Sequence, residues 1–151
     1  MTILKKLIFV GLFFVSCKIN IAQSTVKLGR THYFMTLQPF YKIEKKQGID
    51  YTTFYLLKKS QPDSFRSFVM MGCCVGTIGN NLRNAVKIDS IKQIILGQTA
   101  QWTIYSLDSS YLAETMIPIN DAEKAVFGIK AKNRYKIDIL ISTFGTLRKS
   151  K

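Results

Sequence analysis

The stretch KIDSIKQIILGQTAQWTIYSLDSSYLAETMIPI, residues 87–119, decides the fold, because it holds three apolar segments separated by short polar turns. The segments Lys87–Leu96, Trp102–Leu107 and Tyr111–Ile119 are rich in β-branched and aromatic residues, which favour strands. Their alternation slips only near Ser90. Because short turns join antiparallel neighbours, we expect these segments to form an antiparallel meander.

Strand signals also fill the first half of the chain. His32–Ile43 is rich in Tyr, Phe and Met, but Pro39 interrupts it, which indicates an edge strand or a bulge. Gln47–Asp50 has the composition of a turn. Tyr51–Leu57 is nearly all β-branched or aromatic and predicts a further strand.

Residues 64–80 fit two structures. Apolar residues within Phe65–Gly72 have helical spacing, and Asp63 or Ser64 could cap a short helix. Three glycines oppose a long helix, since each costs about 1 kcal/mol relative to Ala. We therefore favour a buried strand or a bulged hairpin over Cys73–Ile78.

The C-terminal part predicts one helix followed by one strand. Asn120 and Glu123 have the spacing of a capping box, and the apolar residues after them share one helical face. This helix is expected to end near Lys132. Tyr135–Thr143 then alternates strictly and predicts a final, central strand.

Together these elements predict a mainly β protein. We expect one domain over residues 23–147, an antiparallel β-sandwich or open barrel of six to eight strands. One short α-helix precedes the C-terminal strand in this prediction. Residues 148–151 are basic and are expected to form a frayed tail.

Residues 1–22 have the pattern of a cleavable signal peptide. Lys5 and Lys6 precede the short apolar run Leu7–Val15, and small and polar residues follow it. The run is well below the ~20 residues that span a bilayer, so we expect no transmembrane span. Cleavage after Ala22 would place the protein outside the cytoplasm, either periplasmic or secreted.

A second interpretation of this segment is lipidation at Cys17. The sequence Phe14-Val-Ser-Cys17 resembles a bacterial lipobox, although Phe14 replaces the usual aliphatic residue. The protein would then be a lipoprotein anchored through Cys17.

The charge of the chain is strongly positive. Twenty-two Lys and Arg face nine Asp and Glu, and only three of the lysines lie in residues 1–22. Such an excess raises affinity for anionic lipids, acidic glycans and acidic proteins. Nucleic acid is not expected as a partner, because the chain carries an export signal and no nucleic-acid-binding motif.

Aromatic residues interleave with cations in the first half of the chain, and further cations follow residue 129. Aromatic faces beside cations suit sugar rings, anionic glycans or a protein partner, although alternating strands produce such mixtures by themselves. The candidate residues for an anionic-partner surface are Lys42, Lys45, Lys46, Lys58, Lys59, Lys130, Lys132 and Arg134.

Cys73 and Cys74 are the cysteines that remain after cleavage at Ala22. In an oxidising compartment they are candidates for a disulfide or redox role, for pairing with another chain, or for soft-metal ligation. A disulfide between neighbours is strained, and a metal needs more ligands than this pair supplies. We expect two small buried residues instead.

The sequence predicts no enzyme, cofactor or metal. His32 is the only His, and neither a nucleophile elbow, a zinc-protease helix nor a dinucleotide fingerprint is present. We therefore expect an exported, non-catalytic binding or envelope-associated protein whose basic surface meets an anionic partner. The alternative is a secreted or periplasmic inhibitor or immunity protein that neutralises an acidic enzyme. The oligomeric state stays open.

Overall fold

The computed structural model describes residues 23–58, 66–76 and 84–150, which form two antiparallel sheets and one helix. A seven-stranded sheet has the order β3-β4-β5-β9-β8-β7-β6, and a three-stranded sheet has the order β1-β2-β10. The strands are β1 (Ser24–Lys27), β2 (Tyr33–Leu37), β3 (Tyr41–Gln47), β4 (Tyr51–Lys58), β5 (Ser67–Gly72), β6 (Val86–Ile95), β7 (Gln98–Leu107), β8 (Ser110–Pro118), β9 (Lys124–Ala131) and β10 (Arg148–Lys149), and the helix is α1 (Arg134–Phe144).

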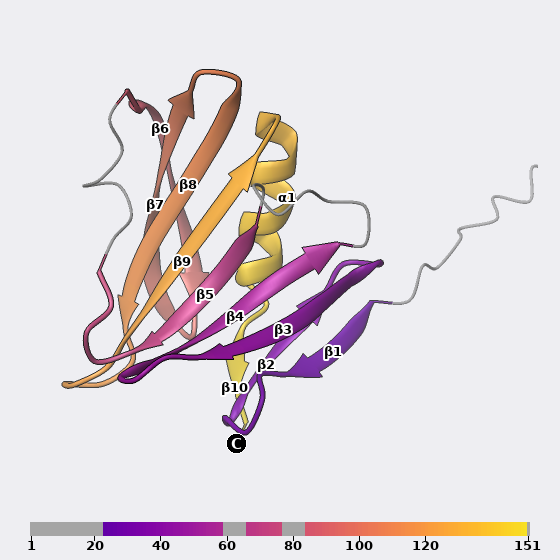
Figure 1. The fold of residues 1–151 in the computed structure, drawn as a ribbon, viewed down its shortest axis with the longest axis vertical. Coiled ribbons are helices and arrows are strands. Elements are labelled where there is room, and N and C mark those ends of the chain that lie inside the picture. Colours follow the sequence, from indigo (N-terminus) through magenta and orange to yellow (C-terminus); the bar gives the residue numbers. More distant parts are fainter. Residues whose placement is uncertain (1–22, 59–65, 77–83, 151) are drawn as a thin grey trace, which may run out of the picture.

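Figure 1 shows the seven-stranded sheet running across the molecule, with α1 beside it and the small sheet below the helix. The large sheet is not closed, and β3 and β6 are its edge strands. The prediction of a mainly β, antiparallel fold with one short helix before the last strand is confirmed. The described residues hold ten strands, against six to eight predicted, because β1 and β10 are short strands that carry weak sequence signals.

The predicted meander is confirmed as β6, β7 and β8. Its slip is a register shift between Lys87 and Asp89 in β6. The first turn lies at Leu96–Gly97, where both residues have positive φ, 52° and 77°. Two consecutive residues with positive φ form a two-residue hairpin turn whose twist matches that of the flanking strands.

Pro39 separates two sheets rather than bending one strand. The predicted strand His32–Ile43 is divided into β2, in the small sheet, and β3, in the large one. The chain changes direction at Pro39 and Phe40, and Phe40 has a φ of 68°. The turn predicted over Gln47–Asp50 lies at residues 48–50, because Gln47 still belongs to β3, and β4 follows it as predicted.

The prediction of a buried strand or bulged hairpin over Cys73–Ile78 is wrong for residues 73–76, and residues 77 and 78 lie outside the described residues. The strand is β5, which ends at Gly72, and Cys73 and Cys74 form a bend after it. Phe68 and Val69, two of the residues with helical spacing, pair with β4 and β9 instead. Two neighbouring strands supply ladder hydrogen bonds that a short helix rich in glycine would lack.

The helix predicted after Asn120 is a strand. The capping-box hydrogen bonds exist, since Asn120 Oδ1 accepts from the backbone N–H of Glu123 at 2.8 Å and Asn120 Nδ2 donates to Glu123 Oε2 at 3.0 Å. They close the turn between β8 and β9, where the backbone N–H groups of Ile119 and Asn120 both donate to the carbonyl of Glu123. The same side-chain chemistry satisfies a hairpin turn as well as a helix end.

The strand predicted over Tyr135–Thr143 is the helix α1. Its buried residues include Ile137, Leu140, Ile141 and Phe144, which have the i, i+3, i+4, i+7 spacing of one helical face. Asn133 caps it by accepting from the backbone N–H of Lys136 at 3.0 Å. The isoleucines alternate in sequence, but the burial follows the helical period.

The core lies where α1 and the small sheet cover one face of the large sheet. Trp102, Phe127 and Phe144 are fully buried and in mutual contact, with ring centroids 5.3–6.0 Å apart. Leu28, directly after β1, and Met35 of β2 belong to the same cluster. This shared core holds the two sheets together.

The segment predicted to be a signal peptide, residues 1–22 with Cys17, lies outside the described residues, and so does Lys59. Over the parts of the chain that are described, no helix combines the length and the apolar character needed to cross a membrane.

Candidate functional site

The residues predicted to form one anionic-partner surface are divided by the fold. Lys42 and Lys46 lie on one face of the edge strand β3, whereas Lys45 lies opposite Phe54 on the core-side face. Lys58, opposite Tyr41, shares the side of Lys45. Alternation along β3 and β4 therefore sends these lysines to two sides of the sheet.

Lys130, Lys132 and Arg134 lie at the junction of β9 and α1, far from the β3–β4 turn in Figure 1. The charge of Arg134 is used within the fold, because its guanidinium pairs with Asp89 at 2.9 Å and with Asp138 at 3.1 Å. The backbone N–H of Ser90 and the Arg134 side chain lower the pKa of Asp89. Those of the predicted residues that the structure describes do not form one patch.

A more compact group of cations lies on the three-stranded sheet. The register places Lys27 opposite Phe34 and Phe34 opposite Arg148, so these three residues form one row across β1, β2 and β10. Lys27 Nζ lies 5.9 Å from the centre of the Phe34 ring. Residues directly opposite on antiparallel strands share a face, so the two cations flank an aromatic ring on the same side of the sheet.

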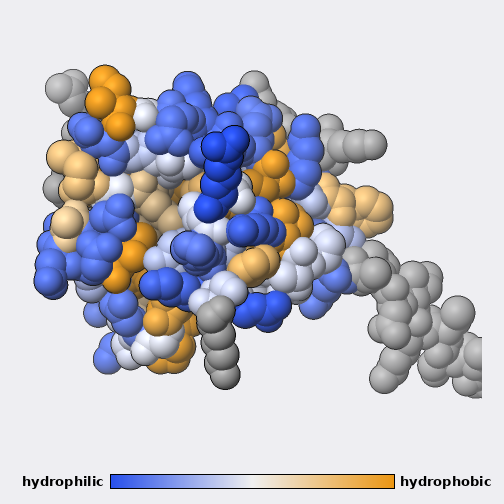
Figure 2. Space-filling view, turned by 90° about the horizontal axis from the view of Figure 1, so that it is seen from below, coloured by the Kyte–Doolittle hydropathy of each residue, from blue (hydrophilic) through white to orange (hydrophobic). Residues whose placement is uncertain are grey.

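The surroundings of this row are basic. Arg30 and His32 lie in the β1–β2 turn, and Lys149 follows Arg148 in β10; all three are exposed. Neither segment 23–43 nor segment 139–151 of the sequence contains Asp or Glu. Figure 2 views the molecule from its lower end and shows hydrophilic residues gathered around smaller hydrophobic areas. We call Lys27, Arg30, Arg148 and Lys149 the basic end.

The basic end could not be predicted from local sequence patterns, because its residues come from the two ends of the described chain. Arg148 and Lys149, expected in a frayed tail, form β10 instead, and the backbone N–H of Ser150 donates to the carbonyl of His32 at 2.7 Å. The one sequence feature that pointed to the basic end was the absence of Asp and Glu from segments 23–43 and 139–151.

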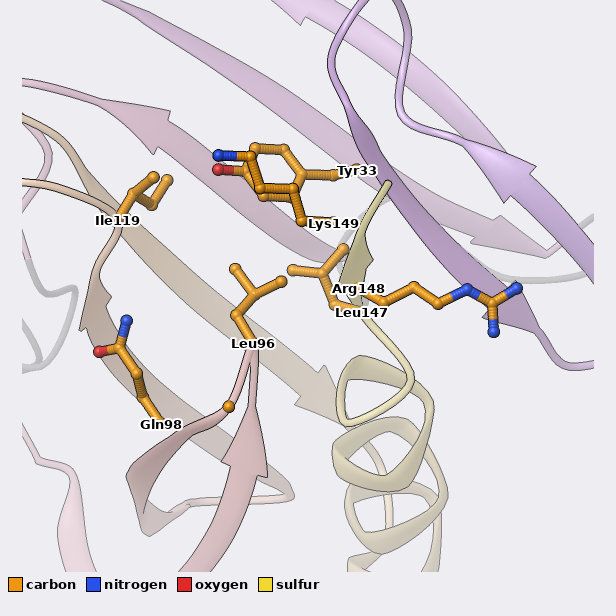
Figure 3. Close-up of a pocket in the computed structure, with 8 residues that line it drawn as sticks. Tyr33, Leu96, Gln98, Ile119, Leu147, Arg148 and Lys149 are labelled. Atoms are coloured by element: carbon orange, nitrogen blue, oxygen red, sulfur yellow. The ribbon is translucent and has the colours of Figure 1, made fainter. Parts of the chain in front are cut away.

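A pocket of about 280 Å³ adjoins the basic end, at the junction of the two sheets. It is lined by Tyr33, Leu96, Gly97, Gln98, Ile119, Leu147, Arg148 and Lys149. Figure 3 shows the Tyr33 ring and the Lys149 side chain side by side, both directed toward Ile119, while the Arg148 side chain points the other way. The pocket thus combines an apolar lining with one ammonium and one phenol group.

The surroundings of Tyr33 shift the pKa of its hydroxyl. Burial, followed by the negative charge of Glu123, raises the pKa of the Tyr33 hydroxyl above its ordinary value. The Gln98 amide is held in place, because its Nε2 donates to the carbonyl of Pro118 at 2.9 Å.

One wall of the pocket is a strained turn. Leu96 has a φ of 52°, a left-handed conformation that is rare for a bulky residue. Its side chain nevertheless packs against the core cluster. The two-residue turn between β6 and β7 requires this positive φ, so the hairpin accounts for the conformation of Leu96.

Cys73 and Cys74 are exposed free thiols, which corrects the expectation that they are buried. Their Sγ atoms lie 3.4 Å apart, because both residues lie in the bend after β5 rather than on a strand. The hydrogen bond to Cys73 and the charge of that thiol raise the pKa of Cys74. Asp50, from the β3–β4 turn, lies beside them.

The single His and three of the carboxylates are spread over the molecule. His32 is exposed in the β1–β2 turn. Glu114 is buried on β8 and accepts a hydrogen bond from the Tyr105 hydroxyl at 3.3 Å. Asp89 and Asp138 are both engaged by Arg134.

No family model, no curated protein and no solved structure matches this chain.

Proposed function

We propose that this chain is an exported, non-catalytic binding protein whose basic end engages an anionic glycan or lipid surface of the cell envelope. The observation that carries the proposal is the row formed by Lys27, Phe34 and Arg148 across three paired strands. Cations held on a sheet keep their spacing, so less conformational entropy is lost on binding than from a frayed tail.

The composition around the row supports an anionic partner. Arg30 adds a cation in the β1–β2 turn, and Lys149 adds one on the opposite face of the small sheet, beside Tyr33. The segments that form the sheet carry no carboxylate to repel an anion. Phe34 lies between the cations of the row, and an aromatic face beside cations suits a sugar ring that bears acidic groups.

The test is binding of the full chain to an immobilised acidic polysaccharide at low and high salt. One variant replaces the four basic-end residues by Gln, and a matched control replaces Lys42, Lys46, Lys87 and Lys92 by Gln. Both variants lose four charges. We expect the basic-end variant to lose about tenfold or more in affinity at low salt, with a weaker salt dependence, because each cation near an anionic surface contributes about 1 kcal/mol.

Equal losses in the two variants would show that only total charge matters and would refute the basic end as the site. Retention of a stoichiometric acidic protein, with no binding to the polysaccharide or to anionic vesicles, would favour the inhibitor or immunity role instead. Both roles require export. Mass spectrometry of the N-terminus of protein recovered from its native source tests this, with Gln23 expected first, or a diacylglyceryl thioether on Cys17 if the protein is a lipoprotein.

A further inference from the structure

Three metal-ligating side chains converge from two separate turns. Asp50 ends the β3–β4 turn, and Cys73 and Cys74 follow β5. The pairing of Tyr51 with Gly72 brings the two turns together, because β4 and β5 are neighbours in the large sheet. The sequence separates Asp50 from the cysteines by more than twenty residues, so spacing alone gave no sign of this cluster.

The backbone fixes the cluster at close range. The N–H of Cys73 donates to the carbonyl of Asp50 at 3.3 Å. A Cβ atom at Gly72 would collide with the Asp50 carbonyl and would lie 2.7 Å from Tyr51 Cα. Glycine at this position therefore allows the approach that places the thiols beside the carboxylate.

The donor atoms have the separations of a chelate. One carboxylate oxygen and both Sγ atoms all lie within 4.8 Å of one another, and the two sulfurs are 3.4 Å apart. Two sulfurs bound to one tetrahedral zinc at about 2.3 Å each are separated by about 3.8 Å, so small side-chain rotations suffice. A disulfide would instead need the sulfurs to approach to about 2.05 Å within a strained ring.

We propose that Cys73, Cys74 and Asp50 form a binding site for a thiophilic divalent cation, of the class of Zn²⁺ or Cd²⁺. The two thiolates select a soft or borderline metal, and the carboxylate completes three protein ligands. All three side chains are exposed, so the remaining coordination position is open to solvent. The site is separate from the basic end and does not depend on the function proposed for it.

The test uses the full chain carrying Cys17→Ala, so that only the paired thiols remain, kept reduced and titrated with Cd²⁺. We expect one equivalent to bind and to produce the ultraviolet charge-transfer absorption of cadmium–thiolate bonds. Cys73→Ala and Cys74→Ala should each lower the affinity at least tenfold. Asp50→Asn should lower it about tenfold with the absorption retained, whereas Asp121→Asn, an exposed carboxylate elsewhere, should leave it unchanged.

A second readout is stability. Bound metal stabilises the folded state, so Cd²⁺ should raise the unfolding temperature of the reference chain and not that of the Cys73→Ala chain. Circular dichroism of each variant without metal establishes that it is folded. The proposal is overturned if Cd²⁺ produces the same absorption and affinity in the Cys→Ala variants, or if Asp50→Asn matches Asp121→Asn.

Discussion

At the scale of single residues, two asparagines show what a local motif can and cannot specify. Asn120 and Asn133 both accept backbone N–H groups two or three residues ahead, at 2.8–3.0 Å. Asn133 begins a helix, whereas Asn120 closes a hairpin turn. The hydrogen bonds near Asn120 could be predicted from the sequence. The strand after them could not, because β9 is stabilised by its pairing with β5 and β8.

The cap at Asn133 can be tested by Asn133→Ala. Loss of the hydrogen bond to the N–H of Lys136 should lower the free energy of unfolding by about 1 kcal/mol. Urea denaturation measures the change. Ser109→Ala, at an exposed turn position, is the control and should stay within about 0.5 kcal/mol. A cap variant as stable as the control would contradict the helix start described above.

Gly72 and Gly76 form a matched pair for a second test. Gly72→Ala places a methyl group against the Asp50 carbonyl and should lower the free energy of unfolding by about 1–3 kcal/mol. Gly76→Ala meets no atom within 4 Å and should be neutral or slightly stabilising. Thermal or urea unfolding distinguishes the two. If both variants unfold alike, the close approach of β5 to the β3–β4 turn is wrong.

At the scale of elements, the strand and the helix near the C-terminus were exchanged, and the reason is physical. The sequence from Tyr135 to Thr143 is rich in Ile, a β-branched residue with high strand propensity. Propensity gives way to tertiary contacts, since α1 packs its buried face against β9, β8 and β2. Phe144, beyond the alternating run, was the sign of helical spacing, because it continues the series from Ile137, Leu140 and Ile141.

Two aromatic residues at the ends of α1 distinguish the helical burial pattern from the alternating pattern of a strand. Phe144→Ala removes a fully buried ring that contacts Trp102 and Phe127, and it should cost about 3–5 kcal/mol. Tyr135→Ala should cost less than about 0.5 kcal/mol, because Tyr135 is 74% exposed. Chemical denaturation provides both values. A strand that buried Tyr135 with the isoleucines would give a large loss at Tyr135 instead.

For the molecule as a whole, the sequence predicted the fold class better than the arrangement of the strands. The meander could be predicted because its turns are short and its strands are neighbours in sequence. The small sheet joins Ser24–Leu37 to Arg148–Lys149 across more than a hundred residues, and no local pattern encodes such a pairing. The net charge could likewise be counted from the sequence. Which four cations gather at the basic end depends on the fold.

This long-range pairing gives a prediction for the C-terminus. Deleting residues 148–151 removes the pairing of β10 with β2 and the hydrogen bond from Ser150 to His32. The free energy of unfolding should fall by about 1–2 kcal/mol, since each lost hydrogen bond contributes about 1 kcal/mol. Arg148→Gln with Lys149→Gln keeps the backbone pairing and should retain most of the stability. Equal stability of the deletion and the parent chain would show that β10 does not support the fold.

The open sheet carries a consequence for how this protein behaves in concentrated solution. Three apolar residues of the edge strand β6 are 46–63% exposed: Val86, Ile88 and Ile94. An exposed apolar edge strand can pair with the same strand of another molecule. Lys87, Asp89 and Lys92 interrupt that strand, and its register shift distorts the edge. We expect these charges to oppose fibril growth, so the tendency to aggregate should depend on this strand as well as on the overall charge.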